Sequence, residues 1–244
     1  YNNRIVVKVG TSTLTNDAGK SDLRTTDRLA CVLSDIQNMG YEVVLVSSGA
    51  IAVGRNKLNM TAKPDSMRMK QAAAAVGQCS LMYLYDKFFG DYDKTVAQIL
   101  LNADDIEEEE KKENLINTFN ALLEMGVIPI VNENDSVSYK EIESEDRLFG
   151  DNDMLSAVVA VLCRAKHLVI FSDIDGFYDH DPRLYPNAQL IDQIDTIDDS
   201  VYALAGGAGS RRGTGGMRTK LQAASLATSQ GTNTIVTNGK RPEV

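Results

Sequence analysis

Short apolar segments rich in β-branched residues alternate along this chain with segments that carry an apolar stripe at helical spacing. The expected strands are Arg4 to Val9, Glu42 to Val46, Thr95 to Leu101, Val127 to Val131, His167 to Phe171 and Thr234 to Thr237. Several of them are apolar at consecutive positions, which is typical of strands covered on both faces. The alternation predicts an α/β fold, with a mostly parallel sheet between helical layers.

Composition limits the partners of such a fold. The 244 residues carry a net charge of -9, so the surface has no general attraction for nucleic acid or for an anionic membrane. No apolar stretch is long enough to span a bilayer and the first residues lack a secretory pattern, which predicts a cytoplasmic protein. Cys31, Cys79 and Cys163 are far apart and are predicted to be reduced core thiols.

Ligands of such folds bind beyond the carboxyl ends of the strands, so the residues that follow each expected strand are the candidates for a site. Lys8 ends the first strand, just before Gly10, and it could either contact a phosphate or snorkel from an edge strand. Ser48 and Gly49 follow the second strand, where a strand-to-helix turn could attract an anion or simply pack on its helix.

Two further segments are unusually polar. Asp135 lies in the run after the fourth strand, where it could receive a substrate ammonium group or form an Asx turn. Asp151, Asn152 and Asp153 precede a helix, and they are more polar residues than an N-cap requires. Their number favours a role in orienting a ligand or a lysine in addition to capping.

Two segments could surround a nucleotide. Ser172 and Asp173 follow the fifth strand, at the edge of the sheet where nucleotides bind. The glycine-rich segment that opens the last helix offers backbone amides and a cation for phosphate oxygens; it comprises Thr214, Gly215, Gly216, Met217, Arg218, Thr219 and Lys220. Neither segment matches the P-loop, the dinucleotide fingerprint or the protein-kinase motifs, so the nucleotide must be held in another way.

Taken together and in order, these motifs closely resemble those of the amino acid kinase family, and in particular its members that phosphorylate glutamate. The resemblance covers nearly the whole chain, and the most specific part is NEND followed by GDND and then GTGGMRTK. The motifs are KVGTS at Lys8, VSSGAIAVG at Val46, IPIVNENDSV at Ile128, FGDNDMLSA at Phe149, FSDIDGFYDHDPR at Phe171 and GTGGMRTK at Gly213.

The resemblance implies a three-layer αβα sandwich formed by a single domain over residues 1–244. About 1–150 would bind the amino acid and about 151–244 would bind ATP. Lys8 and Lys220 would neutralise the transferring phosphoryl group, with Asp153 holding both. The residues implied for glutamate are Ser48, Gly49, Asp135 and Asn152; those implied for ATP are Lys8, Gly10, Ser172, Asp173 and the segment from Thr214 to Lys220.

The resemblance also implies the reaction. ATP, with Mg²⁺ carried on its phosphates rather than by protein ligands, would phosphorylate the side-chain carboxylate of L-glutamate as the first step of proline biosynthesis. Proline would be a feedback inhibitor, and the protein would be a homo-oligomer, a dimer or a tetramer. Many relatives carry an RNA-binding-like PUA domain after the kinase domain; none is expected in this chain. Arg218 stands where some relatives have a small residue, which could alter nucleotide contacts.

Rival functions remain open from the residues alone. Related enzymes act on N-acetylglutamate, aspartate, carbamate or UMP, and Asp135 favours a substrate with a free ammonium group. A sensing protein with this fold and no catalysis is a further alternative. The presence of Lys8, Asp153 and Lys220 argues against it, because a protein that only binds has no need of paired phosphoryl cations.

Overall fold

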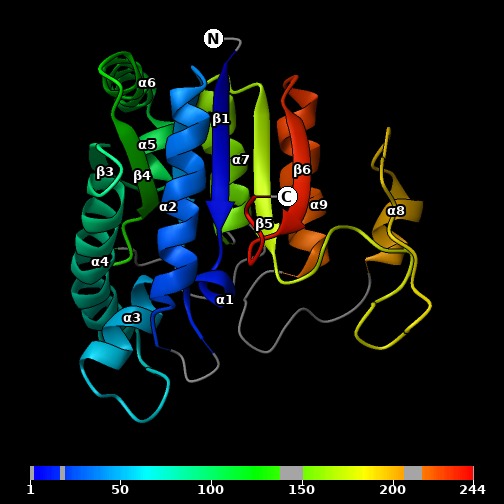
Figure 1. The fold of residues 1–244 in the computed structure, drawn as a ribbon, viewed down its shortest axis with the longest axis horizontal. Coiled ribbons are helices and arrows are strands. Elements are labelled where there is room, and N and C mark those ends of the chain that lie inside the picture. Colours follow the sequence, from blue (N-terminus) through cyan, green and yellow to red (C-terminus); the bar gives the residue numbers. More distant parts are fainter. Residues whose placement is uncertain (1–2, 17–19, 138–150, 206–215, 244) are drawn as a thin grey trace.

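A parallel sheet forms the middle layer of the molecule (Figure 1). The structure is a computed structural model that describes residues 3–16, 20–137, 151–205 and 216–243. Within these residues the sheet has six strands in the order β3-β4-β2-β1-β5-β6, and every ladder is parallel. The strands are β1 (Arg4–Val9), β2 (Glu42–Ser47), β3 (Val96–Leu101), β4 (Ile128–Glu133), β5 (His167–Ser172) and β6 (Asn233–Asn238).

The segments predicted to be strands are strands, with ends that differ by one or two residues at most. The largest difference is at β4, which continues past Val131 to Glu133 and so carries Asn132 into the ladder opposite Leu100. The register pairs Val9 of β1 with Ser47 of β2, so these two strands end side by side. The parallel sheet and its α/β class are as predicted.

Helices cover both faces of the sheet. The helices are α1 (Thr11–Leu14), α2 (Leu23–Asn38), α3 (Ala50–Lys57), α4 (Met67–Gly90), α5 (Asp104–Glu107), α6 (Glu109–Glu124), α7 (Asn152–Leu162), α8 (Asp199–Leu204) and α9 (Met217–Ser229). One apolar cluster joins the sheet to α6, α7 and α9, and a second joins it to α1, α2, α3 and α4. The molecule is therefore the expected three-layer αβα sandwich (Figure 1).

Helix α2 illustrates how sequence specifies the elements. Asp22 caps its first turn by accepting a hydrogen bond from the backbone N–H of Thr25, and Leu29 and Leu33 bury its apolar stripe. Met39 is the C-cap residue and is 74% exposed, because it lies past the last turn of the helix. Gly40 follows with φ of +92°, the left-handed conformation that commonly ends a helix.

Helices α3 and α4 cross in backbone contact. A Cβ atom built on Gly54 would lie 1.8 Å from the carbonyl oxygen of Ala73, and one on Gly77 would lie 1.7 Å from the carbonyl oxygen of Ala50. Both distances are far below any real carbon–oxygen contact, so only glycine allows this approach. The crossing anchors α4 beside the start of α3, at the carboxyl edge of the sheet.

The cysteines differ in their surroundings. Cys163 is buried, and burial raises the pKa of its thiol to about 12. Cys79 is exposed, contrary to the prediction of a core thiol, because it lies opposite the face of α4 that buries Gly77, Leu81 and Tyr85. Among the described residues, no helix is both long and apolar enough to cross a membrane.

Candidate active site

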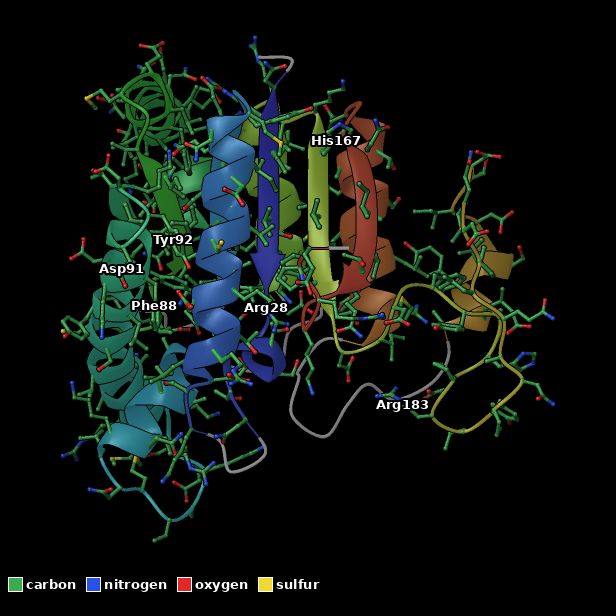
Figure 2. The ribbon with its side chains drawn as sticks, in the orientation of Figure 1. Arg28, Phe88, Asp91, Tyr92, His167 and Arg183 are labelled. Atoms are coloured by element: carbon green, nitrogen blue, oxygen red, sulfur yellow. The ribbon has the colours of Figure 1, made fainter. Side chains whose placement is uncertain are left out.

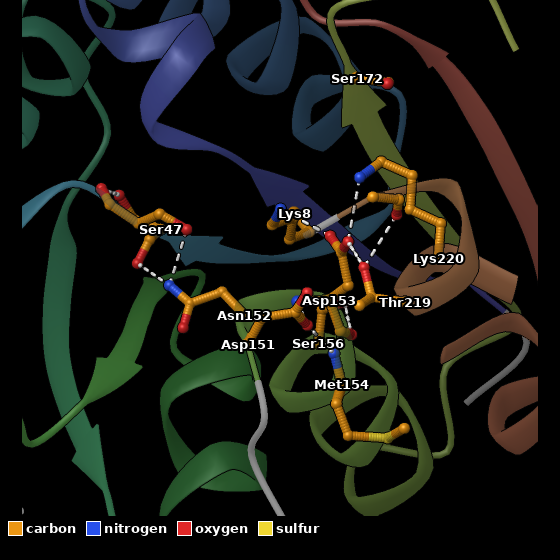
Figure 3. A network of polar contacts seen from close by, with 12 residues as sticks. Lys8, Ser47, Asp151, Asn152, Asp153, Met154, Ser156, Ser172, Thr219 and Lys220 are labelled. Carbon is orange, nitrogen blue, oxygen red and sulfur yellow. Dashed lines mark hydrogen bonds and ion pairs between the residues drawn. The ribbon is translucent and has the colours of Figure 1, made fainter. Parts of the chain in front are cut away.

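Three charged side chains from distant parts of the chain meet beyond the carboxyl end of β1. Nζ of Lys8 lies 2.5 Å from Oδ1 of Asp153, and Nζ of Lys220 lies 3.0 Å from Oδ2 (Figure 3). Asp153 is completely buried, while Lys8 and Lys220 are 8% and 7% exposed. Lys8 is thus a buried and paired lysine of a central strand rather than a snorkelling one, and the predicted catalytic residues form one cluster.

The electrostatics of the cluster favour an ionised carboxylate. Burial alone raises the pKa of Asp153, but the positive charges of Lys8 and Lys220 and their hydrogen bonds outweigh it and hold that pKa below its usual value. The hydroxyl of Thr219 adds a further hydrogen bond of 3.0 Å to Oδ2 of Asp153. One buried negative charge therefore faces two buried positive charges, and the cluster retains a positive excess suited to an anionic ligand.

The start of α7 explains why Asp153 is free to face the lysines. Oδ1 of Asp151 accepts hydrogen bonds from the backbone N–H groups of Asp153, at 2.9 Å, and Met154, at 3.1 Å, so Asp151 is the N-cap. In addition to the capping by Asp151, this segment places the side chain of Asp153 against Lys8 and Lys220.

Asn152 belongs to a second group of contacts beside the lysine cluster (Figure 3). Its Nδ2 lies 2.7 Å from Oγ of Ser48, 3.1 Å from the carbonyl oxygen of Ser47 and 3.1 Å from Oδ1 of Asn132. Asn152 and Ser48 are both among the residues that the family resemblance implies for glutamate, and the structure brings them into direct contact. Gly49 follows with φ of +99°, a left-handed conformation that turns the chain from β2 into α3.

Asp135 lines a pocket at the end of β4, away from the lysines. The other wall of this pocket comes from α4 and β3, through residues that include Gln78, Cys79 and Leu100. Asp135 is half-buried. In the sheet order, β2 lies between β4 and β1, so the strand that this pocket follows and the strand of Lys8 are separated by one strand along the same edge.

A second pocket lies at the end of β5, on the other side of the lysine cluster. Ser172 and Asp173 line it together with Gly216, Met217 and Lys220, all of which were predicted to surround a nucleotide. Its remaining wall consists of Ile174, Phe177, Tyr178, His180, Asp181, Pro182, Arg183, Leu204 and Ala205, most of which belong to the motif that begins at Phe171.

Arg183, labelled in Figure 2, contacts two other residues that line this pocket. Its guanidinium donates to Oδ1 and Oδ2 of Asp181 at 2.9 and 3.0 Å, and lies 3.6 Å from Oδ2 of Asp173. Arg218, also predicted to contact ATP, lies over the ring of Tyr202 with its guanidinium carbon 5.8 Å from the centroid. A contact of this kind is a cation–π interaction.

The remaining predicted residues have different outcomes. Gly10 lies next to the cluster, since a Cβ atom built on it would be 3.5 Å from Nζ of Lys8. Thr214 and Gly215 fall outside the described residues. Asn132 and Gln78, which connect Asn152 to α4, were missed; Asn132 had one signal, a polar residue extending an apolar strand, and Gln78 had none.

Solved structures of other kinases share this fold. The crystal structure of a product complex of T. acidophilum isopentenyl phosphate kinase superposes with a TM-score of 0.65 at 17% identity, covering 98% of this chain and 92% of that one. Carbamate kinase from Giardia lamblia bound to AMP-PNP gives a TM-score of 0.66 at 16% identity, with coverage of 98% and 94%. At these identities the likeness establishes the fold alone.

Sequence relatives are much closer. A protein of Clostridium perfringens named glutamate 5-kinase is 56% identical over 241 residues, which is 99% of this chain and 89% of that protein. One of Listeria innocua with the same name is 51% identical, covering 99% and 87%. The sequence profile of the amino acid kinase family matches residues 3–238. The chain therefore belongs to the amino acid kinase family.

Proposed function

We propose that this chain transfers the γ-phosphate of ATP to the side-chain carboxylate of L-glutamate, giving ADP and L-glutamyl 5-phosphate. The observation that carries the proposal is the convergence of Lys8 and Lys220 on Asp153 between two pockets at the carboxyl edge of the sheet. The name glutamate 5-kinase, borne by relatives at 56% and 51% identity, supports glutamate as the acceptor.

The chemistry asks the protein mainly for positioning and for positive charge. An oxygen of the glutamate carboxylate forms a bond to the γ-phosphorus, and the bond from that phosphorus to the bridging oxygen breaks as ADP leaves. Because the carboxylate is already ionised near neutral pH, no general base is needed. Lys8 and Lys220 would stabilise the charge on the equatorial oxygens of the phosphoryl group.

Asp153 would act by holding the lysines rather than by touching the substrate. With each of its two oxygens on one lysine, it spaces the ammonium groups and keeps them pointing into the site. ATP would bring Mg²⁺ on its phosphates, where the ion shields negative charge. The described residues hold no group of three acidic, histidine or cysteine side chains that could bind a metal ion themselves.

Each of the two pockets would bind one of the two substrates. Glutamate would lie between the lysine cluster and the pocket of Asp135, in contact with Ser48, Gly49 and Asn152, and with Asp135 at its ammonium group. ATP would lie in the pocket of Ser172 and Asp173, its phosphates directed toward Gly10, Lys8 and the start of α9 from Gly216 to Lys220. The division corresponds to an amino-acid half of about 1–150 and an ATP half of about 151–244.

The proposal extends to the metabolic role, regulation and assembly of the protein. Glutamyl 5-phosphate would commit glutamate to proline synthesis in the cytoplasm, with proline as the feedback inhibitor and a homo-oligomer as the working form. These parts of the proposal rest on the family resemblance.

A substrate panel tests the proposal. Release of ADP is measured with ATP and Mg²⁺ in the presence of glutamate, aspartate, N-acetylglutamate, carbamate or UMP. Glutamate is expected to give the highest kcat/KM. Turnover of aspartate or UMP with none of glutamate would overturn the proposed substrate, and no turnover of any acceptor would favour a binding protein with this fold.

A further inference from the structure

The side chain of Gln78 on helix α4 is hydrogen-bonded to Asn132, which in turn contacts Asn152 in the proposed glutamate site. We propose that Gln78 is a positioning residue for the reaction, which acts through Asn132 to orient the amide of Asn152 toward the substrate. The inference rests on the proposed function, because it names the ligand that Asn152 would meet. It assigns a role to a residue that no motif marks.

A continuous chain of hydrogen bonds joins Gln78 to Asn152. Nδ2 of Asn132 donates to Oε1 of Gln78 at 3.0 Å, and Oδ1 of Asn132 accepts from Nδ2 of Asn152 at 3.1 Å. Nδ2 of Asn152 in turn donates to Oγ of Ser48 at 2.7 Å. The chain crosses from α4 through the tip of β4 to the first residue of α7.

The side chain of Asn132, in the middle of this chain of hydrogen bonds, has little freedom to reorient. Asn132 is only 2% exposed, so water does not readily replace a lost partner. Its Oδ1 also accepts from the backbone N–H of Glu133 at 2.9 Å, so the oxygen end is fully used and the NH₂ end depends on Gln78. Removing the acceptor on Gln78 leaves a buried donor unsatisfied, which favours a rearranged Asn132 side chain.

The contacts of Asn152 determine which hydrogen-bonding groups of Asn152 and Ser48 are left for a substrate. The two hydrogens of Nδ2 in Asn152 are shared among Ser47, Ser48 and Asn132, so the carbonyl end of this amide is the one left to accept from a ligand. Because Oγ of Ser48 accepts from Asn152, its own proton is directed elsewhere and can donate to a carboxylate. The orientation of Asn132 therefore controls a donor and an acceptor for an amino acid.

Two other residues of α4 hold Gln78 in place. Gly77, its neighbour, docks against the backbone of Ala50 with no room for a Cβ atom. Two turns after Gln78 on α4, the hydroxyl of Tyr85 lies 2.7 Å from Oγ of Ser47, and both residues are buried. Burial raises the pKa of Tyr85, against a smaller lowering by Ser47, so the hydroxyl stays neutral.

A competing role for Gln78 is direct contact with the substrate, since it lines the pocket of Asp135. The two roles need different ends of its amide. Positioning needs the acceptor Oε1, which glutamate also has and methionine lacks. Direct donation to a substrate carboxylate needs Nε2, which both replacements lack, and a glutamate there would repel the substrate.

The test compares Gln78→Met with Gln78→Glu in steady-state kinetics. We expect Gln78→Met to raise the KM for glutamate by about ten- to hundredfold with the KM for ATP nearly unchanged, the size of effect produced by one unsatisfied buried group. Gln78→Glu should lie closer to the parent protein than Gln78→Met does. A glutamate KM for Gln78→Glu equal to or above that of Gln78→Met, or an unchanged KM in Gln78→Met, would overturn the inference.

Two further measurements complete the design. Gln37→Met, which removes a side-chain hydrogen bond to Gly126 on an exposed surface, is the matched control and should leave the glutamate KM within about twofold. The ¹H–¹⁵N resonances of the Asn132 and Asn152 amides should shift in Gln78→Met and return in Gln78→Glu. Those resonances test the hydrogen-bond chain even if glutamate proves not to be the substrate, so the two proposals fail separately.

Discussion

Oδ1 of Asp153 lies 2.5 Å from Nζ of Lys8, although Asp153 is in the first turn of α7 and Lys8 is near the end of β1. Both side chains are nearly inaccessible to solvent. An ion pair this deeply buried is costly unless both charges are needed, because desolvation offsets much of the attraction. The pair is therefore better explained by the charge of the substrate than by the stability of the fold.

Removing Lys220 tests its role in the chemical step. Lys220→Met should lower kcat by about a hundred- to a thousandfold, since one preorganised positive group is lost from the transferring phosphoryl group. The glutamate KM should change little, because Lys220 lines the other pocket. Single-turnover kinetics with excess enzyme will separate the chemical step from binding. A kcat close to that of the parent protein would exclude Lys220 from the mechanism.

Asp153→Asn should destabilise the fold. The change leaves two buried ammonium groups with no counter-charge, and the loss of one partner from a buried pair costs about 3–5 kcal/mol. Urea unfolding at neutral pH measures the cost. Asp199→Asn, an exposed carboxylate in the first turn of α8, is the control and should cost less than about 0.5 kcal/mol. Equal stability of both variants would contradict the importance of the cluster.

The stability difference between the parent protein and Asp153→Asn should depend on pH. Because the folded-state pKa of Asp153 is lowered, its contribution to stability is present above the unfolded pKa of about 3.9 and is lost as pH falls through the folded value. The difference in unfolding free energy between the parent protein and Asp153→Asn should therefore shrink as the pH is lowered below about 4. A difference that stays constant from pH 7 to pH 3 would show that the lysines do not act on this carboxyl.

Asp135→Ala should act on glutamate alone. If Asp135 receives the substrate ammonium group, the glutamate KM should rise by about ten- to a hundredfold, the loss of one charge-assisted hydrogen bond, while the ATP KM is unchanged. Steady-state kinetics with each substrate varied in turn provide the comparison. A glutamate KM like that of the parent protein would leave the pocket of Asp135 without a role in binding the ammonium group.

Gly77→Ala tests the crossing of α3 and α4. The added Cβ would meet the carbonyl oxygen of Ala50, so the helices must separate and both stability and kcat/KM should fall. Gly90→Ala is the matched control on the same helix, because nothing lies within 4 Å of its Cβ position. The control should be neutral or slightly stabilising in thermal unfolding. Identical behaviour of the two variants would contradict the close approach.

Sequence predicted the parts of this molecule that depend on local pattern. The strands were readable because buried parallel strands are continuous apolar runs. Lys8, Ser48, Asn152 and Asp153 were predicted as site residues because they lie near the end of a strand, follow one or begin a helix. The burial of Cys79 was predicted wrongly, since an apolar residue on the outer face of a helix carries no sign of its exposure.

What sequence could not predict depends on the order of the strands. The sheet places β1 between β2 and β5, which brings the two pockets to either side of Lys8, and no local pattern encodes that order. Gln78 was invisible for the same reason: it sits within a long helix, and its role arises only where α4 passes the tip of β4. Contacts of this kind follow from packing.

Identification of the product tests the central claim most directly. The protein is incubated with ATP, Mg²⁺, glutamate and hydroxylamine, and mass spectrometry follows the acyl phosphate as its hydroxamate. The account predicts the side-chain hydroxamate of glutamate, one ADP for each hydroxamate, and formation of both products at least about a hundredfold slower in Lys8→Met and Lys220→Met. Formation of ADP without any glutamate hydroxamate, or full product formation by the lysine variants, would contradict it.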